Sequence, residues 1–277
     1  MKKHLSIIFV LLFVVAGSIM AGEPSAKFAA SYSYGPSLEV AVDIPYSDVD
    51  VPEMVNSAAG FTLARIKVPQ DKELLVGVSA EIGIVTDTSV KGKLGGAAKA
   101  IAGGEAFVRV FAVPVDGIGD SIEAMPEGGV ILSKRVQELN ATLGGVIQSC
   151  SVSCTYDEGT GLVTCGDINI GEDCDVYNEE IGLLLDTTAA HHFNFVLPNL
   201  PVGVYDIKAI FTTGARAAVD ICDPGDPCYD EDFMDYDYAE AFASSAAKAV
   251  IGKTMVTVQQ VRATKVGINE VDIEVID

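Results

Sequence analysis

Acidic side chains are the first residues in this sequence whose spacing suggests chemistry. The chain carries 39 Asp and Glu against 18 Lys and Arg, for a formal net charge of -21. One acidic group comprises Asp223, Asp226, Asp230, Asp232 and Asp235, and a second comprises Asp167, Asn169 and Asp173. Because Ca²⁺ takes six to eight oxygen ligands, each group is a candidate calcium site, although neither fits the frame of an EF-hand loop. The alternative interpretation is an ordinary solvated loop, or a charged edge that prevents strand pairing.

Cysteines form the second candidate set. The chain has six: Cys150, Cys154, Cys165, Cys174, Cys222 and Cys228. An even number of cysteines in an exported chain predicts disulfides, but the pairing of the first four is not fixed by their spacing. The Asp-Pro-Gly-Asp turn sequence between Cys222 and Cys228 predicts that these two close a small loop. Zinc held by the first four is the alternative, although their spacing lacks paired C-x2-C knuckles.

Two further motifs resemble catalytic patterns, and each has a structural alternative. His191 and His192 are adjacent, and on a strand they would point to opposite faces and could not easily bind one ion together. Ser245 and Lys248 form a Ser-x-x-Lys string without the companion motifs of serine acyl-enzymes. Nucleophile-elbow, zinc-protease and phosphate-loop motifs are missing from the sequence. Paired carboxylates for glycan cleavage are available among 39 acids, but nothing in the sequence selects one pair.

The first residues of the chain predict export. Lys2 and Lys3 precede an apolar run from Leu5 to Val15, and small residues follow up to Ala21. This is the layout of a signal peptide cleaved after Ala21, and the alternative is an uncleaved anchor, for which the run is short. The mature protein is therefore expected to be extracellular or periplasmic, without a later membrane span. Its acidity argues against nucleic acid as a partner, whereas a homo-oligomer or a cell-surface partner is compatible with it.

The elements that must position these residues are expected to be strands. Segments rich in Val, Ile, Phe and Thr, punctuated by Gly and Pro, predict strands at 61–68, 74–85, 106–115, 136–147, 181–185, 193–197, 204–212, 255–261 and 271–276. The Ala-rich segment 97–102 could form a helix by propensity, whereas alternation in 239–251 favours a strand. We predict an all-β, antiparallel β-sandwich with jelly-roll or Greek-key wiring. The expected divisions are a signal peptide (1–21), an extended segment (22–53) and a sandwich domain (54–277) with a Cys-rich insertion (150–178) and an acidic loop (220–238).

An internal duplication is a further hypothesis. Gly77-Val78 recurs as Gly203-Val204, and Ile84-Val85-Thr86 recurs at the same offset as Ile210-Phe211-Thr212. Both halves read as a Pro turn, a strand, a loop and an Ala-rich strand. If the two halves derive from one unit, they would supply matching hairpins to one sandwich.

The residues 178–187, with 193–198 and 203–205, resemble a group of uncharacterised exported bacterial β-sandwich proteins, and the likeness extends from about Phe61 to Arg262. The resemblance implies an exported β protein and assigns no site residue. Two functions are therefore carried forward. The first is a non-catalytic secreted protein with a binding or structural role, supported by calcium at the acidic loops. The alternative is a secreted hydrolase that acts on glycans through two carboxylates.

Overall fold

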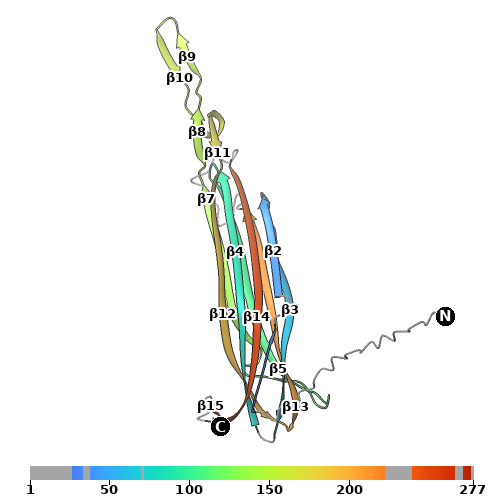
Figure 1. Ribbon diagram of the computed structural model, residues 1–277. Coiled ribbons are helices and arrows are strands. Elements are labelled where there is room, and N and C mark those ends of the chain that lie inside the picture. Colours follow the sequence, from blue (N-terminus) through green and yellow to red (C-terminus); the bar gives the residue numbers. More distant parts are fainter. Residues whose placement is uncertain (1–26, 34–37, 70–71, 222–238, 266–270, 276–277) are drawn as a thin grey trace, which may run out of the picture.

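The computed structural model describes residues 27–33, 38–69, 72–221, 239–265 and 271–275, with side chains of the last stretches described up to residue 261. The expected signal peptide, the acidic group from Asp223 to Asp235, and both Cys222 and Cys228 lie outside the described residues. The described chain is almost entirely β, which confirms the predicted all-β class. It forms antiparallel sheets that pack together (Figure 1).

The first sheet is built around its longest strand. β14 (Glu240–Lys265) pairs along one side with β4 (Lys72–Lys93), which in turn pairs with β12 (Glu179–Leu200). The other side of β14 is shared by three short strands, β2 (Leu38–Ser47), β1 (Phe28–Ser33) and β15 (Val271–Val275). The range 22–53, expected as an extended segment ahead of the domain, thus contributes β1 and β2 to this sheet.

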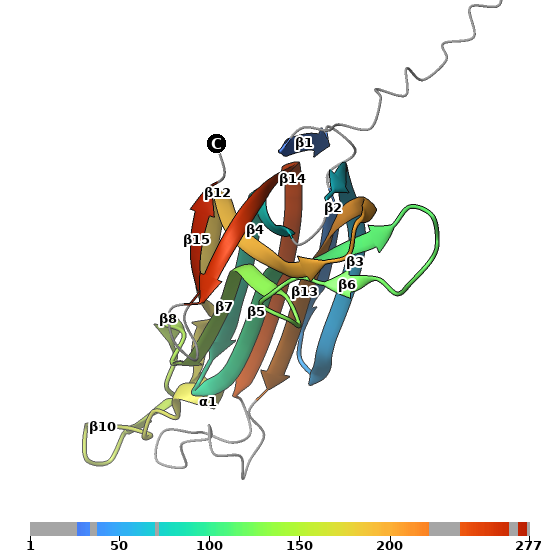
Figure 2. The same ribbon diagram turned by 90° about the horizontal axis from the view of Figure 1, so that it is seen from below.

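The second sheet has the strand order β3 (Val51–Val68), β13 (Gly203–Ile221), β5 (Gly96–Pro114) and β7 (Val130–Leu143), with the short β6 (Ile122–Glu123) beside the end of β5. Figure 2 shows the two sheets as layers seen end-on. β12 is an edge strand of the first layer, and β7 is an edge strand of the second layer on the same side of the molecule.

Alternation of side chains places the core between the layers. In β4 the residues with even numbers point inward, and Leu74, Val76 and Ile82 are fully or almost fully buried. The part of the core near these residues contains large aliphatic and aromatic side chains, whereas the other part is lined mainly by alanines such as Ala100, Ala217 and Ala247. Small side chains let the layers approach closely in that part of the molecule.

Strands that follow one another in the chain often lie in opposite layers. β4 ends at a two-residue turn, Leu94-Gly95, in which both residues have positive φ angles (53° and 89°), and β5 then begins in the second sheet. β13 and β14 are related in the same way, with β13 in the second sheet and β14 in the first. Each expected repeat unit is therefore an arch between the layers and not a hydrogen-bonded hairpin. The two arches interlock, because β4 pairs with β14 and β5 pairs with β13.

A narrow arm extends beyond the end of the two sheets (Figure 1). It consists of β8 (Val146–Cys150), β9 (Cys154–Asp157), β10 (Leu162–Cys165), the single helical turn α1 (Ile170–Asp173) and β11 (Cys174–Tyr177). β8 pairs with β11, and β9 pairs with β10. The arm corresponds to the Cys-rich insertion expected at 150–178.

Most strands expected from the sequence lie within observed strands, and most observed strands are longer. The expected strand 136–147 is instead divided between β7 and β8, with the positive-φ Gly145 in the break, and the expected strand 106–115 ends one residue earlier, at Pro114. The Ala-rich segment 97–102, which could form a helix by propensity, is part of the strand β5. The segment 239–251, for which a strand was favoured, is strand from Glu240 onward, in β14. Alanine has high helix propensity but also fits a tightly packed strand face, and here the packing between layers decides.

Candidate functional site

The four described cysteines form two disulfides, Cys150–Cys174 and Cys154–Cys165, with Cα–Cα distances of 4.0 Å. In each bridge the two residues face each other across paired strands. The four sulfurs are therefore bonded in pairs, so the zinc alternative for them is wrong. The bridges also indicate an oxidising environment.

The second acidic group lies in the arm, and two of its members, Asn169 and Asp173, use their side-chain oxygens on the backbone of the arm. The Asn169 side chain accepts a hydrogen bond from the Gly171 amide at 3.0 Å and caps the turn α1. The Asp173 carboxylate accepts from the Asn169 amide at 2.9 Å. Within the described residues no group of three or more His, Cys, Asp or Glu is placed to hold a metal ion. Calcium binding therefore stays a prediction, carried by the residues from Asp223 to Asp235 that lie outside the described chain.

The His pair and the Ser-x-x-Lys string are each divided between two faces of a strand. His192 exchanges hydrogen bonds with Ser79 and Asn194 at 2.9 and 3.0 Å, whereas His191 lies on the inward face of β12. Ser245 is buried and donates to the Ile101 carbonyl, while Lys248 on the opposite face forms an ion pair with Glu39 at 2.7 Å. The two histidines therefore do not share one site, and Ser245 does not meet Lys248, but His192 does contact the hydroxyl of Ser79.

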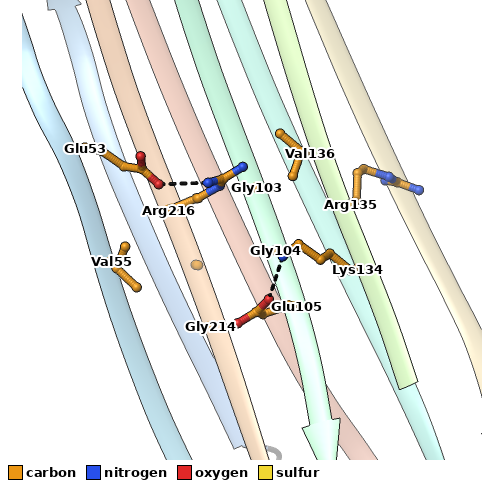
Figure 3. Close-up of a pocket in the computed structure, with 11 residues that line it drawn as sticks. Glu53, Val55, Gly103, Gly104, Glu105, Lys134, Arg135, Val136, Gly214 and Arg216 are labelled. Atoms are coloured by element: carbon orange, nitrogen blue, oxygen red, sulfur yellow. Dashed lines mark hydrogen bonds and ion pairs between the residues drawn. The ribbon is translucent and has the colours of Figure 1, made fainter. Parts of the chain in front are cut away.

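A shallow hollow of about 190 Å³ lies on the outer face of the second sheet (Figure 3). It exists because Gly103 and Gly214 carry no side chain there, and a Cβ on Gly103 would lie 2.8 Å from the Arg216 Nε. Two ion pairs border the hollow, Arg216–Glu53 at 3.0 Å and Lys134–Glu105 at 3.3 Å. A glycosidase acid needs a dry surrounding that retains its proton, and both carboxylates here are about half exposed beside a cation. The hydrolase alternative stays a prediction without support from this hollow.

The open edge of β12 has a long exposed surface. All residues from Glu179 to Ala190 are exposed, on both faces of the strand, although each of them is paired with β4 on one side. Four of them are large and apolar, with exposed fractions of 45% for Ile181, 43% for Leu183, 63% for Leu184 and 40% for Leu185. Such a row on an edge strand is unusual, because natural edges are normally short, charged or covered.

The backbone of this edge offers a regular row of hydrogen-bonding groups. At Val196 both the amide and the carbonyl bond to Met125, on the side away from β4. The pairing with β4 keeps one register from Glu179 to Leu197. In an antiparallel pair successive residues alternate between the two sides, so all even-numbered residues from Glu180 to Asn194 direct their amide and carbonyl outward. No strand of the described chain pairs with them.

The inward side of the same strand is held by two polar residues of β7. Gln137 is buried and donates to the carbonyl of Leu183 and to the hydroxyl of Thr88 at 2.6 Å. Arg135 donates to the carbonyl of Leu185 at 3.3 Å and to the hydroxyl of Thr187 at 2.7 Å. These bonds tie the second layer to β12, so that the edge is fixed in position although its side chains are exposed.

The loop after β6 closes the far end of the edge. Met125 occupies the outward groups of Val196 with hydrogen bonds of 2.8 and 3.0 Å. The loop is fixed by Glu123, which accepts two hydrogen bonds from Arg109 at 2.9 and 2.8 Å and one from the Gly128 amide. The Arg109 guanidinium, with the Gly128 amide, lowers the pKa of the Glu123 carboxyl below its ordinary value. The open part of the edge therefore ends before Val196.

This geometry can accept one more strand. The outward row of amides and carbonyls matches the hydrogen-bonding pattern of an extended segment, and the exposed leucines supply apolar contacts. The sequence predicted strands at 181–185 and 193–197, but it did not identify β12 as an edge. The available signal was the run Leu183-Leu184-Leu185, which presents apolar side chains to both faces of one strand.

Comparisons with family models, curated proteins and solved structures find no match to this chain. Among the described residues, none of the helices has the length and apolar character required to cross a bilayer.

Proposed function

We propose that this protein is a secreted, non-catalytic β-sandwich with a structural role outside the cytoplasm, extracellular or periplasmic, and that β12 is its contact surface. In this role β12 extends its sheet by accepting a strand from a partner. The observation that carries the proposal is the exposed row from Glu179 to Ala190, with outward backbone groups and apolar side chains on a long, fixed strand.

The architecture around the edge supports this role. The strands of the two sheets are up to 26 residues long, and the arm adjoins β12 directly through β11. An elongated body with a rigid open edge is suited to joining subunits, because strand addition provides many backbone hydrogen bonds without a deep pocket. The two disulfides suit an oxidising environment outside the cytoplasm.

Proline at an outward-facing position tests the proposal. Thr188→Pro removes one outward amide and leaves the bonds of β12 to β4 intact, since edge strands tolerate proline where the amide faces solvent. We expect the mature wild-type protein to self-associate in a concentration-dependent manner. We expect the variant to associate at least about tenfold more weakly, because it lacks a ladder donor and places a ring in the path of the added strand. Sedimentation velocity over a range of concentrations measures both.

The matched control is Thr187→Pro, one residue away. The amide of Thr187 faces β4, so this change should destabilise the fold by roughly 3 kcal/mol, as a proline that removes an internal bond does. Thr188→Pro should keep the melting temperature close to that of the wild type. The proposal fails if the wild type is monomeric at all concentrations, or if Thr188→Pro associates as strongly as the wild type.

A further inference from the structure

We propose that the strand added to β12 is β12 of a second copy of this chain, antiparallel and centred on Leu185. This inference rests on the proposed function and names the partner. The pairing would join the first sheets of two molecules into one continuous sheet across a twofold axis.

The alternation of outward-facing backbone groups along β12 permits such a pair. Both copies direct their even-numbered residues outward, and an antiparallel ladder forms when outward residues of one strand face outward residues of the other. A twofold axis normal to the sheet keeps the inward faces of both copies on the same side. With the axis at Leu185, Leu184 of each copy faces Asp186 of the other, and both of these residues direct their backbone outward.

Charge favours this register over the one that is centred one residue further along the strand. Centring on Leu185 places Glu179 of each copy opposite His191 of the other, so that an acid meets an imidazole at both ends. Centring one residue further along would place Asp186 opposite Asp186, and like charges directly opposite each other disfavour pairing. The chosen register avoids this contact.

Side-chain size supports the same register. On the inward face Leu183 would lie opposite Thr187, and Ile181 opposite Ala189, so that each large exposed side chain meets a smaller one. Leu185 would meet its own copy on the axis. This arrangement removes from water the inward-facing members of the apolar row.

The contact of Met125 with Val196 limits how far along β12 a second strand can pair. In this register the last residue engaged is His191, whereas Met125 occupies the outward groups at Val196. Centring three residues further along, on Thr188, would bring Glu180 of the partner onto Val196 and would require the loop with Met125 to be displaced. The loop therefore excludes registers that are centred on Thr188 or further along the strand.

Cysteine cross-linking tests the register. In the proposed pair the two copies of residue 185 face each other on the axis, so Leu185→Cys should form a covalent dimer under mild oxidation, seen on a non-reducing gel. Leu185 is on the surface, so the substitution should leave the fold intact. Thr187→Cys should not cross-link to itself, because residue 187 faces residue 183 of the partner. Leu184→Cys, which is more exposed but faces Asp186, controls for cross-links from random collision.

The outcomes separate this inference from the proposed function. A dimer of Leu185→Cys, with Thr187→Cys and Leu184→Cys at least about tenfold less cross-linked, supports the β12 pair. If Leu185→Cys does not exceed the other two variants while association still depends on Thr188, then the pair is wrong and the proposed function stands with another partner strand. A wild-type protein that is monomeric at all concentrations overturns both.

Discussion

At the scale of single residues, the interior contains a layer of polar side chains between the aliphatic part of the core and the alanine-lined part. Thr86, Thr88 and Gln137 are buried, and Gln137 of the second sheet accepts a hydrogen bond from Thr86 and donates one to Thr88 of the first. Thr213 is also fully buried, but its hydroxyl has no hydrogen-bond partner among the described residues. An unpaired buried hydroxyl costs stability, because it loses its bonds to water and gains none.

Thr213→Val should therefore raise the free energy of unfolding by about 1 kcal/mol, since valine has nearly the same shape and no group to satisfy. Denaturant unfolding measures the change. The opposite result is expected for Thr62→Val, because the Thr62 hydroxyl bonds the Thr254 hydroxyl at 2.6 Å in the buried interior. That variant should lose about 1 kcal/mol. Equal effects in the two variants would show that the missing bond at Thr213 has no energetic consequence.

The sequence identified some of these residues better than others. The disulfide-forming cysteines could be recognised from their number and the expected export, but their pairing could not. Asn169 was predicted as a calcium ligand, whereas it caps the turn α1. The polar layer could not be recognised, because its members come from strands about 50 residues apart and carry no pattern within either strand. Likewise, Ser245 and Lys248 were visible as a string, and only the strand geometry shows that they lie on opposite faces.

At the scale of elements, β12 has two parts with different surroundings. The part from Phe193 to Leu200 contributes Phe195 and Leu197 to the core, whereas the side chains from Glu179 to Ala190 are exposed on both faces. Gln137 and Arg135 of β7 hold this exposed part by its carbonyls. The open edge therefore depends on β7 for its position.

Gln137→Ala should release the exposed part of β12. The change removes bonds to Thr86, Thr88 and Leu183 and leaves a small cavity, so we expect a loss of about 2–3 kcal/mol in the free energy of unfolding. Hydrogen exchange should increase at residues 181–187. Glu138→Ala is the matched control, because Glu138 lies on the outer face in a surface ion pair with Lys99 and should cost less than about 1 kcal/mol. Unchanged exchange in Gln137→Ala would show that β4 alone holds the edge.

Most of the strands were predictable from the sequence, and their arrangement was not. Alternation and the enrichment in Val, Ile and Phe located segments such as 74–85 and 204–212. The lengths of the strands were underestimated, because Gly and Ala inside β4 and β5 suggested that the strands end there. In the structure Gly104 lies within β5 and lets the layers approach, since a Cβ on it would lie 2.8 Å from Ile84. Edge strands could not be distinguished from central strands, since β12 and its partner β4 lie about 100 residues apart in the chain.

At the scale of the whole molecule, the arm and the two sheets are joined but separately stabilised. The strands of the arm pair only with one another within the described chain, and most of their side chains are exposed. The disulfides replace the hydrophobic core that such a narrow element lacks. The body, in contrast, is held by two apolar clusters, one on each side of the polar layer.

Removing the outer bridge with Cys154→Ala and Cys165→Ala should loosen only the arm. We expect faster hydrogen exchange at residues 154–165 and a change of less than about 2 °C in the main melting transition, because the core is untouched. Calorimetry and hydrogen exchange by mass spectrometry make the comparison. Replacing Ala100 in the core by a larger residue serves as the control, because overpacking the core should lower the temperature of the main melting transition. A large drop in melting temperature for the double variant would show that the arm and body unfold together.

The position of β14 in the chain has a consequence for how the molecule is made. β1, β2 and β4 are all synthesised before residue 94, yet each of them finds its central partner in β14, which begins at Glu240. More than half of the chain is therefore synthesised after these three strands and before β14, the strand with which all three pair. Contacts between such distant segments form slowly. The first sheet therefore cannot be completed until almost all of the chain has been synthesised.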